Sequence, residues 1–387
     1  MSKVISKACR TVFVNGECRQ KMKKITKEQL YKRQTTLQEI GEKGQQKLLQ
    51  TKVVIVGCGG LGSTAAVYLA SSGIGTINLV DYDIVDVSNL HRQVFYKTKD
   101  IGKSKVEVLT EHIKSISPFV KVSYTNKAVS KENVFDLIAL VDYVLDCTDS
   151  LPVKYLLNDA CVLKDKPLIY GSLYKFDGYV SSFNVKRSDS SRSSNLRDAF
   201  PEISKEAIPN CSEIGTLNTI VGIIAMMQTN EVLKLVTGVG KPLVDKLLIY
   251  NSLDNSQYNM QLKSSFTKQK IKRVFEGESY FDANCEVQDE TLLISAKALR
   301  QKLSYGEASQ KLHIISVNED TNVKDPFFVH QKIPISKLNL EKQRFIKDNE
   351  YVIVCNKGIS SYIATQRIKA AHPNLNVLSL KKGITNY

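Results

Sequence analysis

The chain has 387 residues, of which 42% are hydrophobic and 24% are charged, a composition sufficient for separate hydrophobic cores in two or three domains. Its eight cysteines have neither the density nor the spacing of a disulfide scaffold, which excludes a small disulfide-stapled protein and suits the reducing cytoplasm. No apolar run reaches, uninterrupted, the roughly 18 residues of a membrane span, so no span is expected.

The formal net charge is +15, from 54 Lys and Arg against 39 Asp and Glu. The lysines are scattered through the whole chain, which favours diffuse solvated charge and some electrostatic steering of an acidic protein partner. Direct nucleic-acid binding is not expected. The first 24 residues are basic as well, and we interpret them as a disordered extension rather than a transit peptide.

A glycine-rich turn follows an apolar, β-branched segment near the start of the chain. Residues 53–62 read Val-Val-Ile-Val-Gly-Cys-Gly-Gly-Leu-Gly, which predicts a buried strand that ends where a helix begins. Glycines let this turn approach a phosphate, whose charge is met by unpaired N–H groups of the helix N-terminus. A second predicted strand, Thr76–Val80, ends at Asp81, whose carboxylate suits ribose hydroxyls. The sequence therefore predicts a nucleotide site.

Basic residues and a carboxylate follow the predicted strands of this region. Ser88–Gln93 lies beyond the second strand, Lys105 comes next, and a further strand, 141–147, leads to Asp149. Because carboxyl ends of parallel strands meet at one edge of a sheet, these groups are expected to converge there. Cations and a metal-holding carboxylate suit ATP cleavage better than dinucleotide binding. The alternative for Arg92 and Lys105 is that they are solvated surface charges. The alternative function is that of a nicotinamide-dependent oxidoreductase.

Seven sequence blocks occur in one order between positions 52 and 184: Gly57–Gly62, Leu79–Asp83, Ser88–Gln93, Gly102–Lys105, Asp146–Asp149, Leu157–Ala160 and Gly171–Ser172. Through these blocks the chain resembles the adenylation domain of the ubiquitin-activating superfamily, in particular the group that activates sulfur carrier proteins. The resemblance implies a Rossmann-like α/β fold with a mostly parallel sheet. It also implies ATP and Mg²⁺, and a ubiquitin-like carrier whose C-terminal glycine is adenylated.

The resemblance assigns roles to single residues. It implies that Gly60 lies under the phosphates, that Asp81 holds the ribose and that Asp149 holds Mg²⁺. The phosphate contacts would come from Asn89, Arg92 and Lys105. The expected nucleotide site as a whole comprises Gly60, Asp81, Ser88, Asn89, Leu90, His91, Arg92, Lys105, Asp149 and Ser150.

The segments Tyr31–Gln34 and Ile40–Gln45 resemble the opening segment of the same family. The second arginine of that segment corresponds to Arg33 and reaches into the nucleotide site of the partner subunit, which implies a homodimer. The family's first arginine is Leu30 in this chain.

Cys355 follows another short apolar strand, Tyr351–Val354, and precedes a helical run, Tyr362–Ala371. Backbone N–H groups of such a loop stabilise a thiolate or a persulfide anion. The loop Cys-Asn-Lys-Gly-Ile-Ser-Ser resembles the C-x-x-G-x-x-S active loop of rhodanese domains, and the resemblance covers residues 291–387. Ser-Val-Asn at 316–318 departs from the usual Asp-Val-Arg of that family. The alternative is a buried structural cysteine.

Cys211 follows a serine-rich stretch and precedes a long apolar helix that ends near Thr237. Its placement resembles that of the superfamily's second catalytic cysteine, which takes the activated carrier as a thioester or acyl disulfide. Most relatives also hold structural zinc with two C-x-x-C pairs. Here residues 192–200 contain no cysteine and only Cys285 stands near the second position, so four thiolates cannot be assembled and zinc is predicted to be absent.

Three further cysteines, at positions 58, 147 and 161, lie in apolar or strand contexts and are predicted to be small core residues. The predicted fold is α/β, with a Rossmann-like adenylation domain and a smaller α/β rhodanese-like domain. The expected boundaries are an N-terminal extension and helical segment over 1–50, the ATP-binding adenylation domain over 51–262, a linker over 263–290 and the rhodanese-like domain over 291–387.

The combined interpretation is an ATP-dependent sulfurtransferase that resembles the eukaryotic molybdopterin synthase sulfurylases. It would adenylate a ubiquitin-like sulfur carrier, then use a persulfide on Cys355, with Cys211 as covalent relay, to leave a thiocarboxylate. A donor such as a cysteine desulfurase would supply the sulfur, which goes on to tRNA wobble-uridine thiolation, molybdopterin synthesis or both. Two alternatives stay open: activation of a ubiquitin-like modifier without sulfur transfer, and a non-catalytic binding module with a decayed rhodanese.

Overall fold

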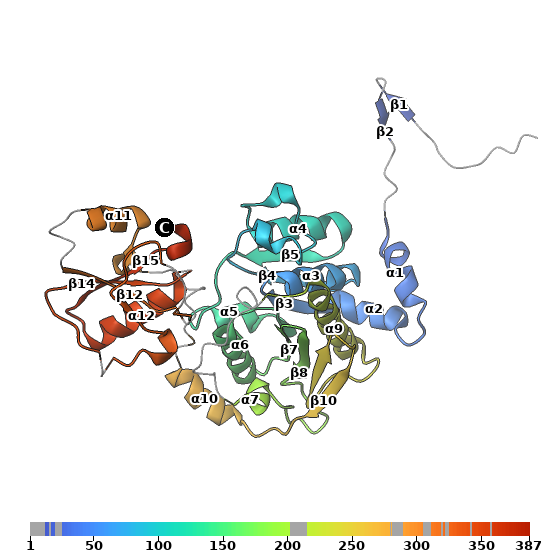
Figure 1. Cartoon of the computed structure of the whole chain (residues 1–387). Coiled ribbons are helices and arrows are strands. Elements are labelled where there is room, and N and C mark those ends of the chain that lie inside the picture. Colours follow the sequence, from blue (N-terminus) through green and yellow to red (C-terminus); the bar gives the residue numbers. More distant parts are fainter. Residues whose placement is uncertain are drawn as a thin grey trace, which may run out of the picture.

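The computed structural model contains two separate β-sheets in an α/β architecture, besides a short N-terminal hairpin (Figure 1). It describes residues 12–14, 17–19, 25–201, 215–278, 280, 289–304, 311–318, 320–321, 325–340, 343–356 and 358–387. The hairpin pairs β1 (Val12–Val14) with β2 (Glu17–Arg19). The larger sheet carries the glycine-rich turn and the smaller one carries Cys355.

The larger sheet has eight strands in the order β10-β9-β8-β7-β6-β3-β4-β5. Five neighbouring strands, β7, β6, β3, β4 and β5, run parallel to one another. The remaining three, β8, β9 and β10, each pair antiparallel with the strand before them. This confirms the expected mostly parallel sheet. The bounds are β3 Lys52–Val56, β4 Thr76–Val80, β5 Lys121–Thr125, β6 Tyr143–Asp146, β7 Leu168–Tyr174, β8 Asp177–Phe183, β9 Lys246–Asn251 and β10 Gln257–Gln261.

Helices cover both faces of this sheet, because its central strands are apolar on both sides. In β3, Val53 and Ile55 belong to the core on one face, whereas Val54 and Val56 belong to the core on the other. The first core includes residues of α2 (Gly41–Gln50), α3 (Gly60–Ser71), α4 (Lys105–Ile116) and α9 (Asn218–Thr237). The second includes residues of α5 (Val134–Ala139), α6 (Leu151–Leu163), α7 (Leu196–Ala199) and α10 (Lys268–Gly277).

Helix α1 (Lys27–Thr35) is anchored ahead of the sheet by a few polar contacts. Gln34 donates from Nε2 to Gln45 Oε1 at 2.7 Å and to the Ser72 carbonyl at 3.0 Å. The buried ring of Tyr31 packs against Gly73, where a Cβ atom would lie 2.9 Å from the ring. The opposite side of the helix leaves Arg33 exposed.

Helix α10 lies inside the segment that the sequence predicted to be a linker, and it packs against α6. Ile271 and Phe275 are its buried residues, and Phe275 joins the core on one face of the larger sheet. Further along, the Tyr280 hydroxyl donates to buried Asp159, whose carboxylate also accepts from the Arg197 guanidinium at 2.7 Å. The first half of the expected linker is therefore fixed to the adenylation fold.

The smaller sheet has five parallel strands in the order β11-β15-β14-β12-β13. Its strands are β11 Leu293–Ile294, β12 Leu312–Ser316, β13 Gln331–Lys332, β14 Glu350–Val354 and β15 Asn376–Leu380, and its helices are α11 Ala296–Ser304 and α12 Ile359–Ala371. Alternate residues of β14 enter two cores: Tyr351 and Ile353 face one, Val352 and Val354 the other. Cys355 comes directly after this strand.

A histidine pair, His313 and His330, lies beside the smaller sheet and is expected to make the stability of this domain depend on pH. Ile314 N–H donates to His330 Nδ1 at 3.0 Å, and the His313 ring lies 4.7 Å from the His330 ring between centroids. Desolvation, and then the neighbouring His313, lower the pKa of His330 below its ordinary value of 6.5. Protons therefore bind the unfolded chain first as the pH falls through 6.5. We expect the Tm of this domain to fall with pH below that value.

Differential scanning calorimetry from about pH 7.5 to about pH 5.5 measures this effect. His330→Asn is the matched control, because its amide oxygen can accept the Ile314 N–H without titrating. The variant is expected to lose part of the pH dependence, and parallel Tm curves for the two proteins would contradict the assignment to His330.

Candidate functional site

The turn between β3 and α3 needs glycine at two positions. Gly57 has φ of +87°, and a Cβ atom there would lie 2.7 Å from the Cys147 carbonyl oxygen. A Cβ atom on Gly62 would lie 1.7 Å from the Gly57 carbonyl oxygen. The predicted strand, turn and helix are confirmed, and α3 begins at Gly60 with its N-terminal N–H groups beside the turn.

The segment after β4 folds back onto this turn. A Cβ atom on Gly60 would lie 3.1 Å from the Arg92 carbonyl oxygen and 2.4 Å from Val221 of α9. Arg92 donates from Nη2 to Asn89 Oδ1 at 2.8 Å and from Nη1 to the Ser88 carbonyl at 3.2 Å. The guanidinium is thus held in place by its own turn, and its backbone touches the glycine that was expected to lie under the phosphates.

The neighbours of Arg92 differ in how far they are enclosed. His91 is exposed, and its Nε2 lies 3.0 Å from Arg92 Nη1, whereas Leu90 is half-buried. Gln93 is buried and donates to Asn89 Oδ1 at 3.3 Å. Two nitrogen donors therefore meet on one amide oxygen, which fixes the orientation of Asn89.

Asp81 connects the end of β4 with the glycine turn. Its carboxylate accepts from Cys58 N–H at 2.6 Å and from Asp83 N–H at 2.9 Å. Desolvation raises the pKa of Asp81 above its ordinary value, and the nearby Lys105 and both N–H donors oppose that shift. Each carboxylate oxygen keeps a second lone pair, so this side chain can still accept from ribose hydroxyls.

Lys105 is the first residue of α4 and is buried, with 4% of its side chain exposed. Its Nζ lies 2.8 Å from Asp83 Oδ2, and the Asp83 side chain is 51% exposed. A cation at a helix N-terminus is disfavoured by the helix dipole, and burial adds to that cost. Such a position is typical of a functional charge. Hydrogen bonds connect it to the glycine turn, because Asp83, the partner of Lys105, donates its N–H to Asp81, which accepts from Cys58 N–H.

Asp149 lies in the loop after β6, at the carboxyl end of the sheet. Its side chain is exposed and has no hydrogen bond or ion pair within the described part of the chain. Ser150 next to it caps α6, because its Oγ accepts from Val153 N–H at 3.2 Å. A free carboxylate on a capped loop fits a hard cation such as Mg²⁺, which is held by one or two carboxylates together with substrate phosphates.

Under this loop lies a buried ion pair that sequence reasoning missed. Lys154 Nζ lies 3.2 Å from the Asp146 carboxylate and donates to the Gly171 carbonyl at 2.7 Å. The same carboxylate accepts from Thr148 Oγ1 at 2.8 Å. Lys154, in the first turn of α6, thus joins the end of β6 to the middle of β7 below the Asp149 loop. The signal available in the sequence was a lysine in the first turn of a largely apolar helix.

Lys154→Met is expected to lower the free energy of unfolding by about 3–5 kcal/mol, because the Asp146 carboxylate would stay buried without a cation. Urea denaturation measures the change. Lys154→Arg keeps the charge and should recover most of the loss, and Lys164→Met, at an exposed position after the same helix, should have little effect. Equal stability of the Lys154→Met and Lys164→Met proteins would contradict this assignment.

Cys355 lies in a cradle of donors on the smaller sheet. Its Sγ accepts from Gly358 N–H at 3.1 Å and from Ser361 N–H at 3.3 Å, and the Ser361 hydroxyl lies 3.3 Å away. Only 3% of the residue is exposed. A cysteine that only fills space in a core needs no such donors, whereas these N–H groups stabilise a thiolate or a persulfide anion.

The C-terminal turn and Asn318 brace this loop. Asn356 N–H donates to Asn318 Oδ1 at 2.9 Å, so the residue in the third position of the unusual Ser-Val-Asn segment fixes the loop directly. On the other side, Ile384 N–H donates to the Cys355 carbonyl and Thr385 Oγ1 to the Asn356 carbonyl. Although Ser-Val-Asn departs from the usual Asp-Val-Arg, its asparagine therefore still supports the loop.

The ThiF family model matches residues 31–271, more than half of the chain. The chain belongs to the ThiF family. A probable adenylyltransferase/sulfurtransferase MoeZ of Mycobacterium tuberculosis is 32% identical over 351 residues, which cover 88% of each chain. The adenylyltransferase and sulfurtransferase MOCS3 of Drosophila grimshawi is 31% identical, covering 95% of this chain and 86% of that protein. Both matches extend well beyond the ThiF segment, and the second, at 95% of this chain, includes Cys355.

Solved structures match this ThiF-family protein in fold. The crystal structure of E. coli MccB with MccA-N7isoASN has a TM-score of 0.55 at 22% identity and covers 62% of this chain and 74% of that chain. The crystal structure of E. coli MccB with ATP has a TM-score of 0.51 at 23% identity, over 57% and 67% of the two chains. These matches establish the Rossmann-like adenylation fold that the resemblance implied.

Other cysteine predictions for this ThiF-family chain have different outcomes. The thiols at 58, 147 and 161 are buried, as predicted, and desolvation raises the pKa of each. Cys211 and Cys285 lie outside the described residues. No group of three or more His, Cys, Asp or Glu side chains suited to a metal occurs among the residues that the structure describes.

The segment 192–200, where relatives were expected to carry one cysteine pair, is held by hydrogen bonds. Asn195 donates from Nδ2 to Asp198 Oδ2 at 2.9 Å, and Asp198 Oδ1 accepts from Ser265 N–H at 2.6 Å and Phe266 N–H at 2.9 Å. These bonds join the segment to the stretch before α10. The absence of zinc stays a prediction.

Proposed function

We propose that this protein adenylates the C-terminal glycine of a ubiquitin-like sulfur carrier and then converts it to a thiocarboxylate. The observation that carries the proposal is the presence of two sites in one chain. One is a glycine turn flanked by Arg92 and buried Lys105, and the other is Cys355 in a cradle of N–H donors. A relative whose match includes both sites is named adenylyltransferase and sulfurtransferase.

In the first step the carrier carboxylate attacks the α-phosphorus of ATP, and pyrophosphate leaves. The carboxylate is ionised at neutral pH, so no general base is needed. Arg92, Lys105 and the N-terminal N–H groups of α3 offset the repulsion between the anions. Mg²⁺, when bound, neutralises phosphate charge, and Asp149 is the residue that would hold it. Asp81 would orient the ribose.

The sulfur step consists of two acyl transfers and then a reduction. The Cys211 thiolate attacks the acyl adenylate and expels AMP, which gives a thioester. The terminal sulfur of a Cys355 persulfide then attacks the thioester carbonyl, expels the Cys211 thiolate and leaves the carrier joined to Cys355 through a disulfide. A dithiol reductant supplies two electrons, which release the carrier thiocarboxylate and the Cys355 thiol. A donor such as a cysteine desulfurase reloads Cys355.

Mass spectrometry of a candidate carrier ending in Gly-Gly tests the proposal. After incubation with ATP, Mg²⁺, a sulfide or persulfide source and dithiothreitol, we expect one oxygen of the carrier to be replaced by one sulfur. Carrier-dependent exchange between ATP and pyrophosphate tests the first step alone, and a nicotinamide-dependent oxidoreductase would show none. Exchange without sulfur gain would instead support activation of a modifier without sulfur transfer. We place tRNA thiolation and molybdopterin synthesis downstream of the thiocarboxylate.

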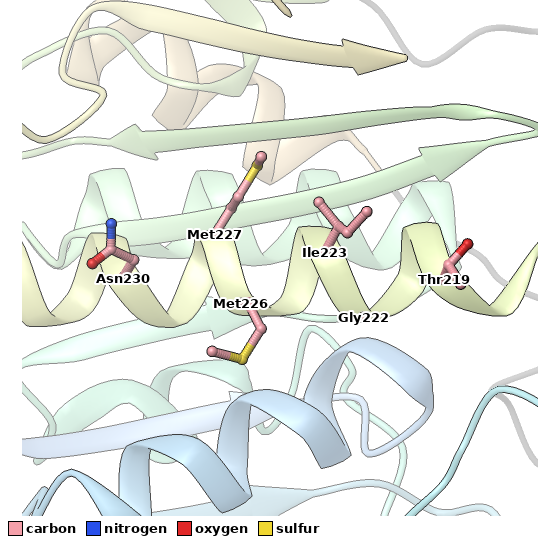
Figure 2. A pocket seen from close by; sticks show the side chains of 6 residues that line it. All are labelled: Thr219, Gly222, Ile223, Met226, Met227 and Asn230. Atoms are coloured by element: carbon pink, nitrogen blue, oxygen red, sulfur yellow. The ribbon is translucent and has the colours of Figure 1, made fainter. Parts of the chain in front are cut away.

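A homodimer is part of this proposal, and the outer face of α9 supports it. Helix α9 packs against α3, β7 and β8 with one side. Over an 18-residue window its mean hydropathy is 1.3, yet only 44% of that window is buried. Figure 2 shows the other face, a shallow groove lined by Thr219, Gly222, Ile223, Met226, Met227 and Asn230. Ile223, Met226 and Met227 form an apolar patch with Thr219 and Asn230 at its rim, an arrangement typical of a protein–protein contact. We propose that a second copy covers this face and brings its Arg33 to the nucleotide site.

Complementation between two inactive variants tests whether Arg33 acts in trans. Arg33→Ala and Lys105→Met are each expected to abolish most of the ATP–pyrophosphate exchange. When the two proteins are co-expressed, half of the dimers are mixed and each mixed dimer holds one intact site, so about a quarter of the wild-type exchange should return. If Arg33 acts within its own subunit, the mixture stays as inactive as either variant.

A further inference from the structure

Ser379 is a fully buried serine in the apolar strand β15, with no exposed area. The parallel register places it beside Ile353, two residues before Cys355. Its Oγ donates to Ser361 Oγ at 2.9 Å. A buried hydroxyl costs free energy unless it is hydrogen-bonded, and this one finds its partner in the loop that holds the cysteine.

Ser361 stands between this serine and the sulfur. It is also fully buried, and its Oγ lies 3.3 Å from Cys355 Sγ. In the thiol form Cys355 can donate its S–H to Ser361 Oγ, but an anionic sulfur can only accept. The serine hydroxyl must then turn and donate to the sulfur. The hydroxyl of Ser379 donates to Ser361 Oγ and so occupies one of its lone pairs. The proton of Ser361 then points away from Ser379, which favours the orientation that donates to the sulfur.

We propose that Ser379 is a positioning residue for sulfur transfer: it donates to Ser361 Oγ and thereby directs the Ser361 hydroxyl toward anionic sulfur on Cys355. The inference rests on the proposed role of Cys355 and deepens it. Sulfur stabilisation then has two contributions, the N–H groups of Gly358 and Ser361 within the loop, and a two-hydroxyl chain that starts on a neighbouring strand.

The test is the pH–rate profile of Cys355 alkylation by iodoacetamide in the full chain, with the labelled peptide identified by mass spectrometry. Ser379→Ala is expected to move the profile to higher pH and to slow alkylation about 3–10-fold at neutral pH. Ser379→Thr keeps the hydroxyl and should restore the wild-type profile. Since the assay needs neither ATP nor a carrier, its result is independent of whether carrier thiocarboxylation is observed.

Thr365→Val is the matched control. Thr365 is fully buried on α12, and its Oγ1 has no hydrogen-bond partner among the described residues. The substitution removes a buried hydroxyl from the same domain and leaves the hydrogen bonds from Ser379 through Ser361 to the sulfur intact. The double variant Ser361→Ala with Ser379→Ala should behave like Ser361→Ala alone, because Ser379 acts only through Ser361. Overlapping profiles of Ser379→Ala and wild type, or equal shifts for Ser379→Ala and Thr365→Val, would overturn the proposal.

Discussion

Lys105→Met is expected to lower carrier-dependent ATP–pyrophosphate exchange by about 10²–10³-fold. The side chain is buried at the start of α4 and points its ammonium group at Asp83, beside the glycine turn. In the transition state negative charge accumulates on the leaving pyrophosphate, and methionine fills the same space without offsetting that charge. The free energy of unfolding should change little, because Asp83 is half exposed and can be solvated once its partner is gone.

Lys103→Met provides the comparison for this prediction. Lys103 is two residues away, 57% exposed and paired with Asp100 at 3.3 Å. Its removal lowers the net charge of the protein by the same amount, so any general effect of charge on carrier encounter appears in both variants. Exchange by the Lys103→Met protein should stay close to wild type. A similar fall in both variants would show that Lys105 has no special role.

Cys355→Ala is expected to abolish thiocarboxylate formation and to leave ATP–pyrophosphate exchange within about twofold of wild type. The thiol is the only group in the cradle able to carry a persulfide, and its removal takes nothing from the adenylation site in the other sheet. The two assays therefore separate the two halves of the proposed reaction. Mass spectrometry of the carrier and exchange of labelled pyrophosphate measure them.

Cys161→Ala is the control for the loss of a buried thiol. Cys161 is fully buried in α6, and desolvation raises the pKa of its thiol, so it is a packing residue. The variant should keep both activities and lose at most about 1–2 kcal/mol of stability. Unchanged thiocarboxylation by the Cys355→Ala protein would instead support a decayed rhodanese domain and would remove the basis for the chain from Ser379.

The sequence by itself determined the local elements around both sites. The apolar run at 53–56, the glycines after it and the strand Thr76–Val80 needed only local preferences, because a buried parallel strand and a phosphate-type turn have distinctive residue requirements. The strand before Cys355 and the helix after it followed in the same way, with boundaries that differ from the structure by one to three residues.

Only the tertiary structure decided which side chains meet. Lys105 pairs with Asp83, Lys154 joins Asp146 to Gly171, and Ser379 reaches Ser361 across strands. The stretch around α10 was likewise predicted to be a linker, because it is rich in charged residues. Its two buried apolar residues, Ile271 and Phe275, belong to a helix that packs on α6. These contacts join residues distant in the chain through strand register and helix packing, which single-sequence patterns do not encode.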